Sequence, residues 1–353
     1  MKKFVGIDTG KRNIIAIRVA DDSKPETLSC GTTADQFQKL KGWVSKTDIV
    51  VLEAGNLAFR IARLLIEKGC KVYVLNPSDL ATIYNSLKKT DREDALKLAR
   101  LGQRIPVSEL PTVTIPSEKE EFCRRLVTER EHWTKTRTKS INRLHSLFVH
   151  AGITDIKKSQ LRTVANRQKA TELLSDTFLG EAKRTLSVIE SAEVVLAEIE
   201  VEMKKLLREE KEYTTLAMSM PGIGPQAAFT LFAYIGDGSR FSHPSQVSYY
   251  AGLVPRVDVS GDQIHYGRII KRGCRQIKRI FLQCSWGLIS AKEGGPLKEF
   301  YNRLYPSKGK KKAAVAVARK MIETFYVMMR NGEFYRDVST EVLNRKLKLY
   351  GLT

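Results

Sequence analysis

The order of apolar and polar residues divides the chain into a strand-rich part and a longer helix-rich part. Near the N-terminus, short runs that are almost wholly apolar predict buried strands, and apolar residues three or four positions apart predict helices. The predicted strands are residues 3–8, 13–19, 48–53 and 71–75, and the predicted helices are residues 57–68 and 91–101. Strands and helices in this order predict an α/β domain with a partly parallel sheet.

Long helices dominate the middle of the chain. A proline-rich linker is predicted over residues 106–116, followed by long helices at 118–149 and 168–211 that a turn near Gly152 would join. Apolar residues follow near-heptad spacing in the second of these helices. Charge-balanced helices with such a stripe favour a packing or dimerising arm.

The last part contains a possible phosphate-binding turn. Met-Pro-Gly-Ile-Gly-Pro at 220–225 resembles a helix-hairpin-helix turn, in which Gly222 and Gly224 would offer backbone N–H groups to a phosphate. A plain loop has the same pattern, so both interpretations stay open. The pattern further predicts a helix at 244–253, two extended pieces around Ser260-Gly261-Asp262, a solvated basic loop at 308–312 and a core helix at 313–329.

The net charge of +21 and the isoelectric point near 9.7 indicate a polyanionic partner, most simply nucleic acid. The excess is concentrated in residues 239–353, which contain 22 basic and 8 acidic residues, whereas residues 111–238 contain 19 and 18. One acid-free segment supplies the candidate nucleic-acid-binding side chains Arg268, Lys271, Arg272, Arg275, Lys278 and Arg279.

Other classes of protein are disfavoured. No apolar run is long enough for a membrane span, and the N-terminus does not resemble a signal peptide. The five cysteines form no CxxC pair, which favours reduced thiols in a cytoplasm over structural zinc.

Four acids form the candidate catalytic set. Asp8 and Glu53 each end a predicted buried strand, and Asp91 and Asp94 share one face of a predicted first helical turn. Ligand sites in α/β sheets lie at the carboxyl ends of strands. Carboxylates that converge there would need a cation, and hard oxygen ligands suit Mg²⁺ or Mn²⁺. Taken singly, each acid is an ordinary surface or helix N-terminal residue.

Several stretches together carry a family resemblance. They are Phe-Val-Gly-Ile-Asp8, Val-Val-Leu-Glu53-Ala, Lys-Thr-Asp91-Arg-Glu-Asp94-Ala, Met220–Pro225, Tyr250–Pro255, Ser260-Gly261 and Gly267–Gly273. The acids resemble the DEDD set of a RuvC-like domain with the ribonuclease H fold. The whole series resembles the bridge-RNA-guided insertion-sequence recombinases, also called DEDD transposases, to which the Piv DNA invertases are related.

The resemblance implies a fold and a mechanism. Residues 1–112 would be an α/β, ribonuclease-H-like (RuvC-like) catalytic domain, residues 113–212 a coiled-coil dimerisation arm, and residues 213–353 a mostly α transposase domain. The acids would hold Mg²⁺ (or Mn²⁺) at a DNA phosphate. Ser260 would match the family's nucleophilic serine, which forms a covalent phosphoserine link to DNA.

The resemblance also implies partners. These would be donor and target double-stranded DNA, a structured guide (bridge) RNA and further copies of the chain. The copies would form a homodimer, and a dimer of dimers on DNA, in which the serine of one protomer completes the acidic site of another. The expected location is the cytoplasm of a bacterium or archaeon, in association with the nucleoid.

Other functions remain open at this point. They are a Piv-like invertase without guide RNA, a RuvC-like metal-dependent structure-selective endonuclease, an actin-like sugar kinase or ATPase, and an inactive nucleic-acid-binding scaffold. The kinase would use Val-Gly-Ile-Asp8-Thr-Gly as a phosphate loop, but we find no adenosine motif. No role is assigned to His265 or Tyr266, and the target sequence, the guide RNA and the choice between insertion, excision and inversion are undetermined.

Overall fold

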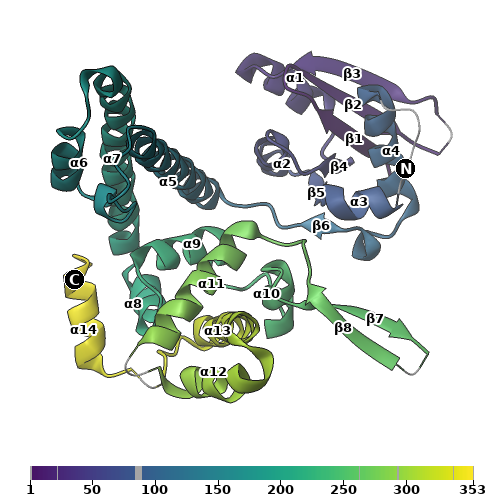
Figure 1. The fold of residues 1–353 in the computed structure, drawn as a ribbon. Coiled ribbons are helices and arrows are strands. Elements are labelled where there is room, and N and C mark those ends of the chain that lie inside the picture. Colours follow the sequence, from purple (N-terminus) through teal and green to yellow (C-terminus); the bar gives the residue numbers. More distant parts are fainter. Residues whose placement is uncertain are drawn as a thin grey trace. The chain divides into compact units, whose positions relative to one another are not determined.

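The computed structural model describes residues 2–21, 23–83, 90–261, 263–291, 294–336 and 338–352. The backbone gathers into two compact units, residues 1–117 and 118–353 (Figure 1). The further division of the second unit near residue 212 stays a prediction. Lys89 and Asp262, which belong to two of the stretches singled out above, lie outside the described residues.

The first unit is built on a mixed sheet. Its described elements are β1 (Phe4–Thr9), β2 (Asn13–Val19), β3 (Glu26–Gly31), α1 (Ala34–Trp43), β4 (Ile49–Glu53), α2 (Ala58–Glu67), β5 (Lys71–Leu75), α3 (Pro77–Ile83), α4 (Asp91–Arg104), a 3₁₀ turn (Val107–Glu109) and β6 (Thr112–Val113). The strand order is β3-β2-β1-β4-β5-β6. β1, β4 and β5 are parallel to one another, while β2, β3 and β6 join antiparallel. The predicted α/β domain with a partly parallel sheet is therefore confirmed.

Helices cover both faces of this sheet. On one face, Val5, Ile7 and Leu52 pack with apolar residues of α1 and α2. On the other face lies α4, which approaches β1 so closely that a Cβ on Gly6 would be 2.0 Å from the backbone oxygen of Ala95. Only glycine fits there, so the position of α4 over β1 is fixed by backbone-to-backbone packing.

The second unit is helical apart from one hairpin. Its described elements are α5 (Glu118–His150), a 3₁₀ turn (Gln160–Arg162), α6 (Val164–Thr171), α7 (Asp176–Glu209), α8 (Lys211–Ser219), α9 (Pro225–Ile235), α10 (Pro244–Tyr250), β7 (Pro255–Ser260), β8 (Gln263–Ile269), α11 (Arg275–Ser290), α12 (Gly295–Lys308), α13 (Lys310–Asn331) and α14 (Thr340–Leu349). None of the described helices is both long and apolar enough to cross a membrane.

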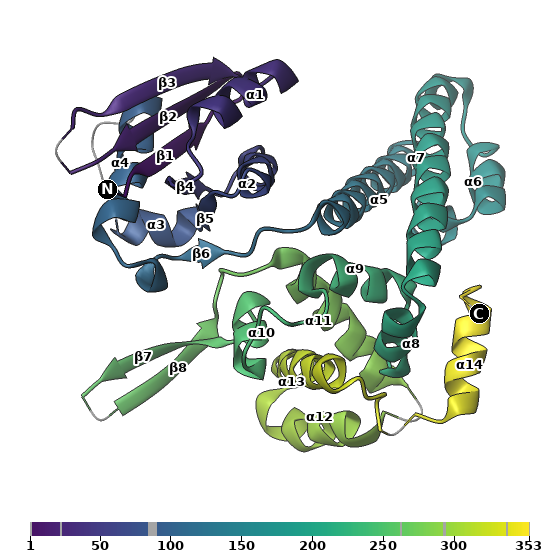
Figure 2. The same ribbon diagram turned by 180° about the vertical axis from the view of Figure 1, so that it is seen from behind.

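The long helices α5 and α7 lie side by side and antiparallel (Figure 2). Ion pairs fix their register: Arg130 bonds Glu200 at 2.7 Å near one end, and Arg143 bonds Glu181 at 3.0 Å near the other. The prediction of one continuous helix over residues 168–211 is wrong. The chain leaves helical geometry after Thr171, so that α6 folds back on α7 and the fully buried Arg167 reaches Glu193 at 2.6 Å.

The body of the second unit is centred on α13. This helix buries Val317, Met321 and Phe325 and contacts α8, α10, α11 and α12. The predicted basic loop at 308–312 is wrong, because α12 continues to Lys308 and α13 begins at Lys310. Gly309 alone separates the two helices, with φ of 76°, a value that favours glycine.

Candidate active site and nucleic-acid surfaces

Asp8 and Glu53 lie side by side at the carboxyl edge of the sheet. Ile7 pairs with Leu52 in the parallel ladder of β1 and β4, so the two acids are the next residues on neighbouring strands, which lie about 4.8 Å apart. Residues alternate between the faces of a strand. Gly6 faces α4, so Asp8 faces α4 as well. Val51 packs with residues of α4, which places Glu53 on that same face.

The first turn of α4 contributes the other two acids. Thr90 is the N-cap, and its hydroxyl accepts a hydrogen bond from the Glu93 N–H at 3.2 Å, which fixes the start of the helix. Asp91 and Asp94 follow in that turn, where acidic side chains also complement the helix dipole. Asp94 accepts a 2.7 Å bond from Lys97, one turn further on.

The pKa of Asp8 shows that the acids interact. Burial raises the pKa of this carboxyl above its ordinary value, and the charges of Asp91 and Asp94 raise it further, whereas the Thr9 N–H lowers it. The structure thus brings three of the predicted acids within electrostatic reach of one another, and the strand register places Glu53 beside them. Like charges held together favour a protonated carboxyl or a bound cation.

The chemistry of this acid edge fits a hard divalent ion, because carboxylate oxygens are the ligands that Mg²⁺ and Mn²⁺ prefer. As the side chains stand, no three His, Cys, Asp or Glu residues among those described are close enough together to hold a metal ion. One oxygen of Asp94 is engaged by Lys97, so an ion at this edge would compete with that ammonium group.

Ser260 ends β7 at the tip of an exposed hairpin. It pairs with Gln263, and Gly261 follows it in the turn with φ of 56°. Asp258 pairs with His265, and because residues two apart share a face, Ser260 lies on the same face as these two polar residues.

The opposite face of the hairpin is apolar. Val257 pairs with Tyr266 and Val259 with Ile264, and all four side chains are exposed within the second unit. The hairpin therefore has a polar face with the candidate nucleophile and an apolar face that its own unit leaves uncovered.

The two glycines of the predicted phosphate-binding turn lie between α8 and α9. A Cβ on Gly222 would be 2.3 Å from the Cys284 backbone oxygen, so this glycine is needed for close packing on α11. Gly224 is the N-cap of α9. From the other side, Lys346 of α14 donates hydrogen bonds to the backbone oxygens of Met218 and Met220. Two helices joined by a short turn are present, which fits both interpretations of the sequence, and Gly222 has a packing role that the sequence did not reveal.

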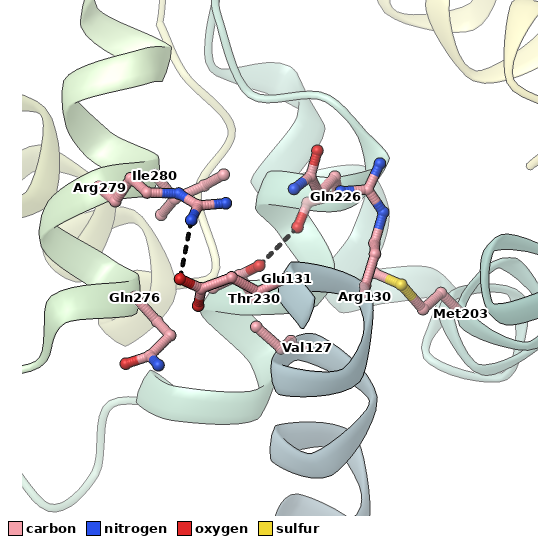
Figure 3. A pocket seen from close by; sticks show the side chains of 9 residues that line it. All are labelled: Val127, Arg130, Glu131, Met203, Gln226, Thr230, Gln276, Arg279 and Ile280. Carbon is pink, nitrogen blue, oxygen red and sulfur yellow. Dashed lines mark hydrogen bonds and ion pairs between the residues drawn. The ribbon is translucent and has the colours of Figure 1, made fainter. Parts of the chain in front are cut away.

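The six predicted basic residues divide into two groups. Arg275 and Arg279 both bond Glu131 of α5, at 2.6 and 3.0 Å, and Lys278 donates to the Ile270 backbone oxygen at 2.9 Å. Figure 3 shows Arg279 reaching Glu131 across a small cavity between α5 and α11. The other group, Arg268, Lys271 and Arg272, is exposed on β8 and the segment that follows it.

Sequence reasoning missed Glu131. This acid is almost fully buried, bonds Lys135 as well as the two arginines, and has a pKa below its ordinary value because these cations outweigh the effect of its burial. The only local signal was the Glu-Lys spacing of four residues, because the arginine partners lie more than 140 positions away in the chain.

Comparison with known proteins identifies the class. A profile of DEDD transposases matches residues 5–153, and a profile described as "Transposase IS116/IS110/IS902 family" matches residues 214–302. These matches include the acid edge and the serine hairpin. The chain belongs to the IS110/IS116/IS902 family of transposases.

Two of three individual relatives align with most of the chain. The pilin gene-inverting protein of Moraxella bovis is 25% identical over 346 residues, which cover 93% of this chain and 96% of the relative. The transposase for insertion sequence element IS1111A of Coxiella burnetii is 23% identical over 300 residues, which cover 82% of this chain and 80% of the relative. An IS110 protein of Streptomyces coelicolor is 31% identical over 141 residues, which cover 39% of this chain and 34% of the relative.

Proposed function

We propose that this chain is a DNA recombinase that cuts and rejoins DNA at an acidic site formed by Asp8, Glu53, Asp91 and Asp94, with Ser260 as nucleophile. The observation that carries the proposal is that Asp8 and Glu53 directly follow the paired residues Ile7 and Leu52 at one strand edge, where the charges of Asp91 and Asp94 in the first turn of α4 act on Asp8. A cluster of like charges on a rigid sheet is unfavourable for folding and suits a catalytic metal site.

The first unit is proposed to have the ribonuclease H fold of RuvC-like enzymes. The sheet order β3-β2-β1-β4-β5, with an antiparallel β1–β2–β3 meander beside parallel β4 and β5, supports this assignment. In the same proposal, α5 and α7 form a coiled-coil arm that pairs two copies of the chain. Val194 and Val201 support this role, because they lie seven residues apart on α7 and are well exposed.

The four acids are proposed to hold Mg²⁺ or Mn²⁺. When bound there, the ion would neutralise charge that develops on a phosphate. The protein's own contribution is position: β1 and β4 fix two carboxylates in register, and the N-capped α4 fixes the other two. Lys97 would be released from Asp94 as the cation takes its place.

Ser260 is proposed to attack the scissile phosphate. Its Oγ forms a bond to phosphorus while the phosphorus–oxygen bond to one deoxyribose breaks. The hydroxyl proton passes to water, and the departing oxygen takes up a proton. Rejoining is the reverse, with a deoxyribose hydroxyl of a new strand displacing the serine, so the bond energy is conserved without ATP. In the assembly, the serine of one copy would complete the acidic site of another.

The nucleic acid partners are proposed to be donor and target DNA and a structured guide RNA. Base pairing with the RNA would choose the sites, while the protein reads backbone and shape. The exposed cations Arg268, Lys271 and Arg272 support a backbone contact near Ser260. Arg275, Lys278 and Arg279 would act beside them, with two of these residues oriented by Glu131.

A Piv-like invertase without guide RNA is the second candidate. It is favoured by the pilin gene-inverting protein of Moraxella bovis, which aligns with nearly the whole chain. Purified protein tested with and without ribonuclease treatment distinguishes the two. Recombination that persists after RNA is removed, and needs no added transcript, supports the invertase.

The proposed function is tested with a plasmid that carries the DNA flanking the coding region. Unmodified protein with Mg²⁺ should recombine this plasmid, whereas Asp8→Asn and Ser260→Ala should not. Cleavage by Ser260→Ala at the unmodified rate, with no DNA attached to the unmodified protein, would instead indicate an endonuclease that uses water.

A further inference from the structure

The junction of α12 and α13 is the most strongly cationic exposed segment whose function is still unassigned. Every residue from 305 to 312 is exposed, and the segment includes Lys308, Lys310, Lys311 and Lys312. Since Gly309 alone separates two helices that pack side by side, the four lysines gather at one corner of the helical body.

These charges have no acidic partner among the residues that the structure describes. Among the described residues, none of the four lysines forms an ion pair, and the nearest acids in the sequence are Glu299 and Glu323. Three of the lysines occupy the first turn of α13, where the helix dipole disfavours positive charge. The arrangement is therefore electrostatically unfavourable alone and favourable beside a polyanion.

An aromatic ring lies beside the lysines. Tyr305 stacks on the buried Tyr301 with ring centroids 5.8 Å apart and planes 18° from parallel, and about half of Tyr305 is exposed. Lys308 follows Tyr305 by three residues and so shares its side of α12. Tyr301 holds the Tyr305 ring in place, which leaves part of that ring available to another flat group.

We propose that this corner binds an unpaired stretch of nucleic acid, with Lys308 and Lys310–Lys312 on its phosphates and Tyr305 against a base. A duplex keeps its bases stacked inside, whereas single strands bind to proteins that combine cations with exposed aromatic rings. Unpaired DNA and unpaired RNA offer the same chemistry. The acid edge and Ser260 lie outside this surface, so it does not depend on the proposed recombination chemistry.

The lysines are tested by salt-dependent binding of the full chain. Fluorescence anisotropy would follow three labelled probes of one sequence: a 20-nucleotide DNA strand, the matching RNA strand, and the 20-base-pair DNA duplex. For single strands, each phosphate contact contributes about 0.7 to the slope of log affinity against log salt. Replacing all four lysines by glutamine should reduce that slope by roughly 2 to 3.

In a matched control, glutamine replaces four exposed lysines outside the junction, between α5 and the first turns of α7. They are Lys157, Lys158, Lys169 and Lys183. It should leave the single-strand slope almost unchanged. A change equal to that of the junction variant would overturn the proposal, because the effect would then be one of net charge alone. Unchanged thermal melting of both variants shows that folding is not the cause.

The ring is tested by Tyr305→Leu. This change should weaken single-strand binding by roughly 5- to 100-fold, as expected for a lost base stack, while the salt slope and duplex binding stay as in the unmodified protein. If Tyr305→Leu weakens binding of only one of the two single-stranded probes, that probe identifies the ligand of this surface as DNA or as RNA. Unchanged single-strand binding, or equal weakening for the duplex, would overturn the proposal.

Discussion

The acid edge of the first unit and the serine hairpin of the second are held in place in very different ways. Asp8 and Glu53 end strands in the middle of a six-stranded sheet, and α4 is packed against Gly6 so tightly that no side chain fits between them. Ser260 is at the tip of a two-stranded hairpin whose residues are nearly all exposed within its own unit.

This contrast indicates which interactions fix the position of each group. The core of the first unit fixes the acids before any substrate binds, although their mutual repulsion is unfavourable. An isolated two-stranded hairpin is only marginally stable in water. The serine would thus acquire its final position from contacts outside its own unit, and the acids would not.

The largest effects are expected on activity. Asp8→Asn and Ser260→Ala should each reduce recombination of the flanking-DNA plasmid by about a thousandfold or more, since each removes a group that the proposed chemical step requires. Quantitative amplification of DNA across the recombined ends measures the loss of recombination activity. Thermal melting should be unchanged for Ser260→Ala, because the Ser260 side chain is exposed. Recombination within tenfold of the unmodified level would contradict the assigned role.

Two glycine variants compare the rigidity of the two regions directly. Gly6→Ala should destabilise the first unit by about 3 kcal/mol, because its Cβ would overlap the α4 backbone. Gly261→Ala should destabilise by only about 1 kcal/mol, the strain of a positive φ in otherwise open space.

Tryptophan fluorescence in urea measures the difference between these variants. For Gly6→Ala, Trp133 and Trp286 are replaced by phenylalanine, so that Trp43 reports on the first unit alone; for Gly261→Ala, Trp43 is replaced instead, so that Trp133 and Trp286 report on the second unit. Equal unfolding midpoints of this signal for Gly6→Ala and the parent would show that α4 does not pack on β1 as described.

A buried lysine should give the second unit a pH dependence. Burial lowers the pKa of Lys346 from 10.5 to about 8. The unfolded chain therefore binds this proton more tightly, and stability should rise by roughly 2 to 3 kcal/mol between pH 8 and pH 10.5. Urea unfolding across that range measures the rise, and Lys346→Met should lack it. A parallel rise in both proteins would assign the effect to other groups.

Asp8 should give a smaller effect of opposite sign in the first unit. Its pKa is raised on folding, so its contribution to stability falls as the pH rises from 3.8 through the higher folded-state pKa. Asp8→Asn should therefore stabilise the first unit at pH 7, by less than about 1 kcal/mol because solvent screens this half-exposed group. Millimolar Mg²⁺ should stabilise the unmodified protein and have little effect on the variant. A destabilised Asp8→Asn protein would contradict the repulsion between the acids.

Local sequence patterns were sufficient for much of the acid edge. Near-continuous apolar runs predicted β1, β4 and β5, and the rule that parallel strands end at one edge predicted that Asp8 and Glu53 would lie together. The edge strand β6 was not predicted, because two residues in a proline-rich segment carry no periodic signal. The nearness of Asp91 and Asp94 to Asp8 depends on the packing of α4 on Gly6, a contact between distant residues.

The second unit was harder to predict for the same reason. Arg275 and Arg279 look like free cations in the sequence, and only the folded chain brings Glu131 to them. Lysine-rich residues 308–312 look like a loop, but they continue two helices whose other turns are anchored in the core. The helix break after Thr171 lets α6 fold back so that Arg167 reaches Glu193, a contact that the sequence pattern did not indicate.

Mass spectrometry of the protein–DNA adduct tests the central proposal most directly. The protein would react with Mg²⁺ and a flanking-DNA substrate nicked beside the exchange site, so that the released fragment diffuses away and the intermediate accumulates. Digestion by nuclease and trypsin should then yield the peptide containing Ser260 with a nucleotide on its hydroxyl, and Asp8→Asn should yield none. Recombination without any adduct, or with the nucleotide on another residue, would contradict the account.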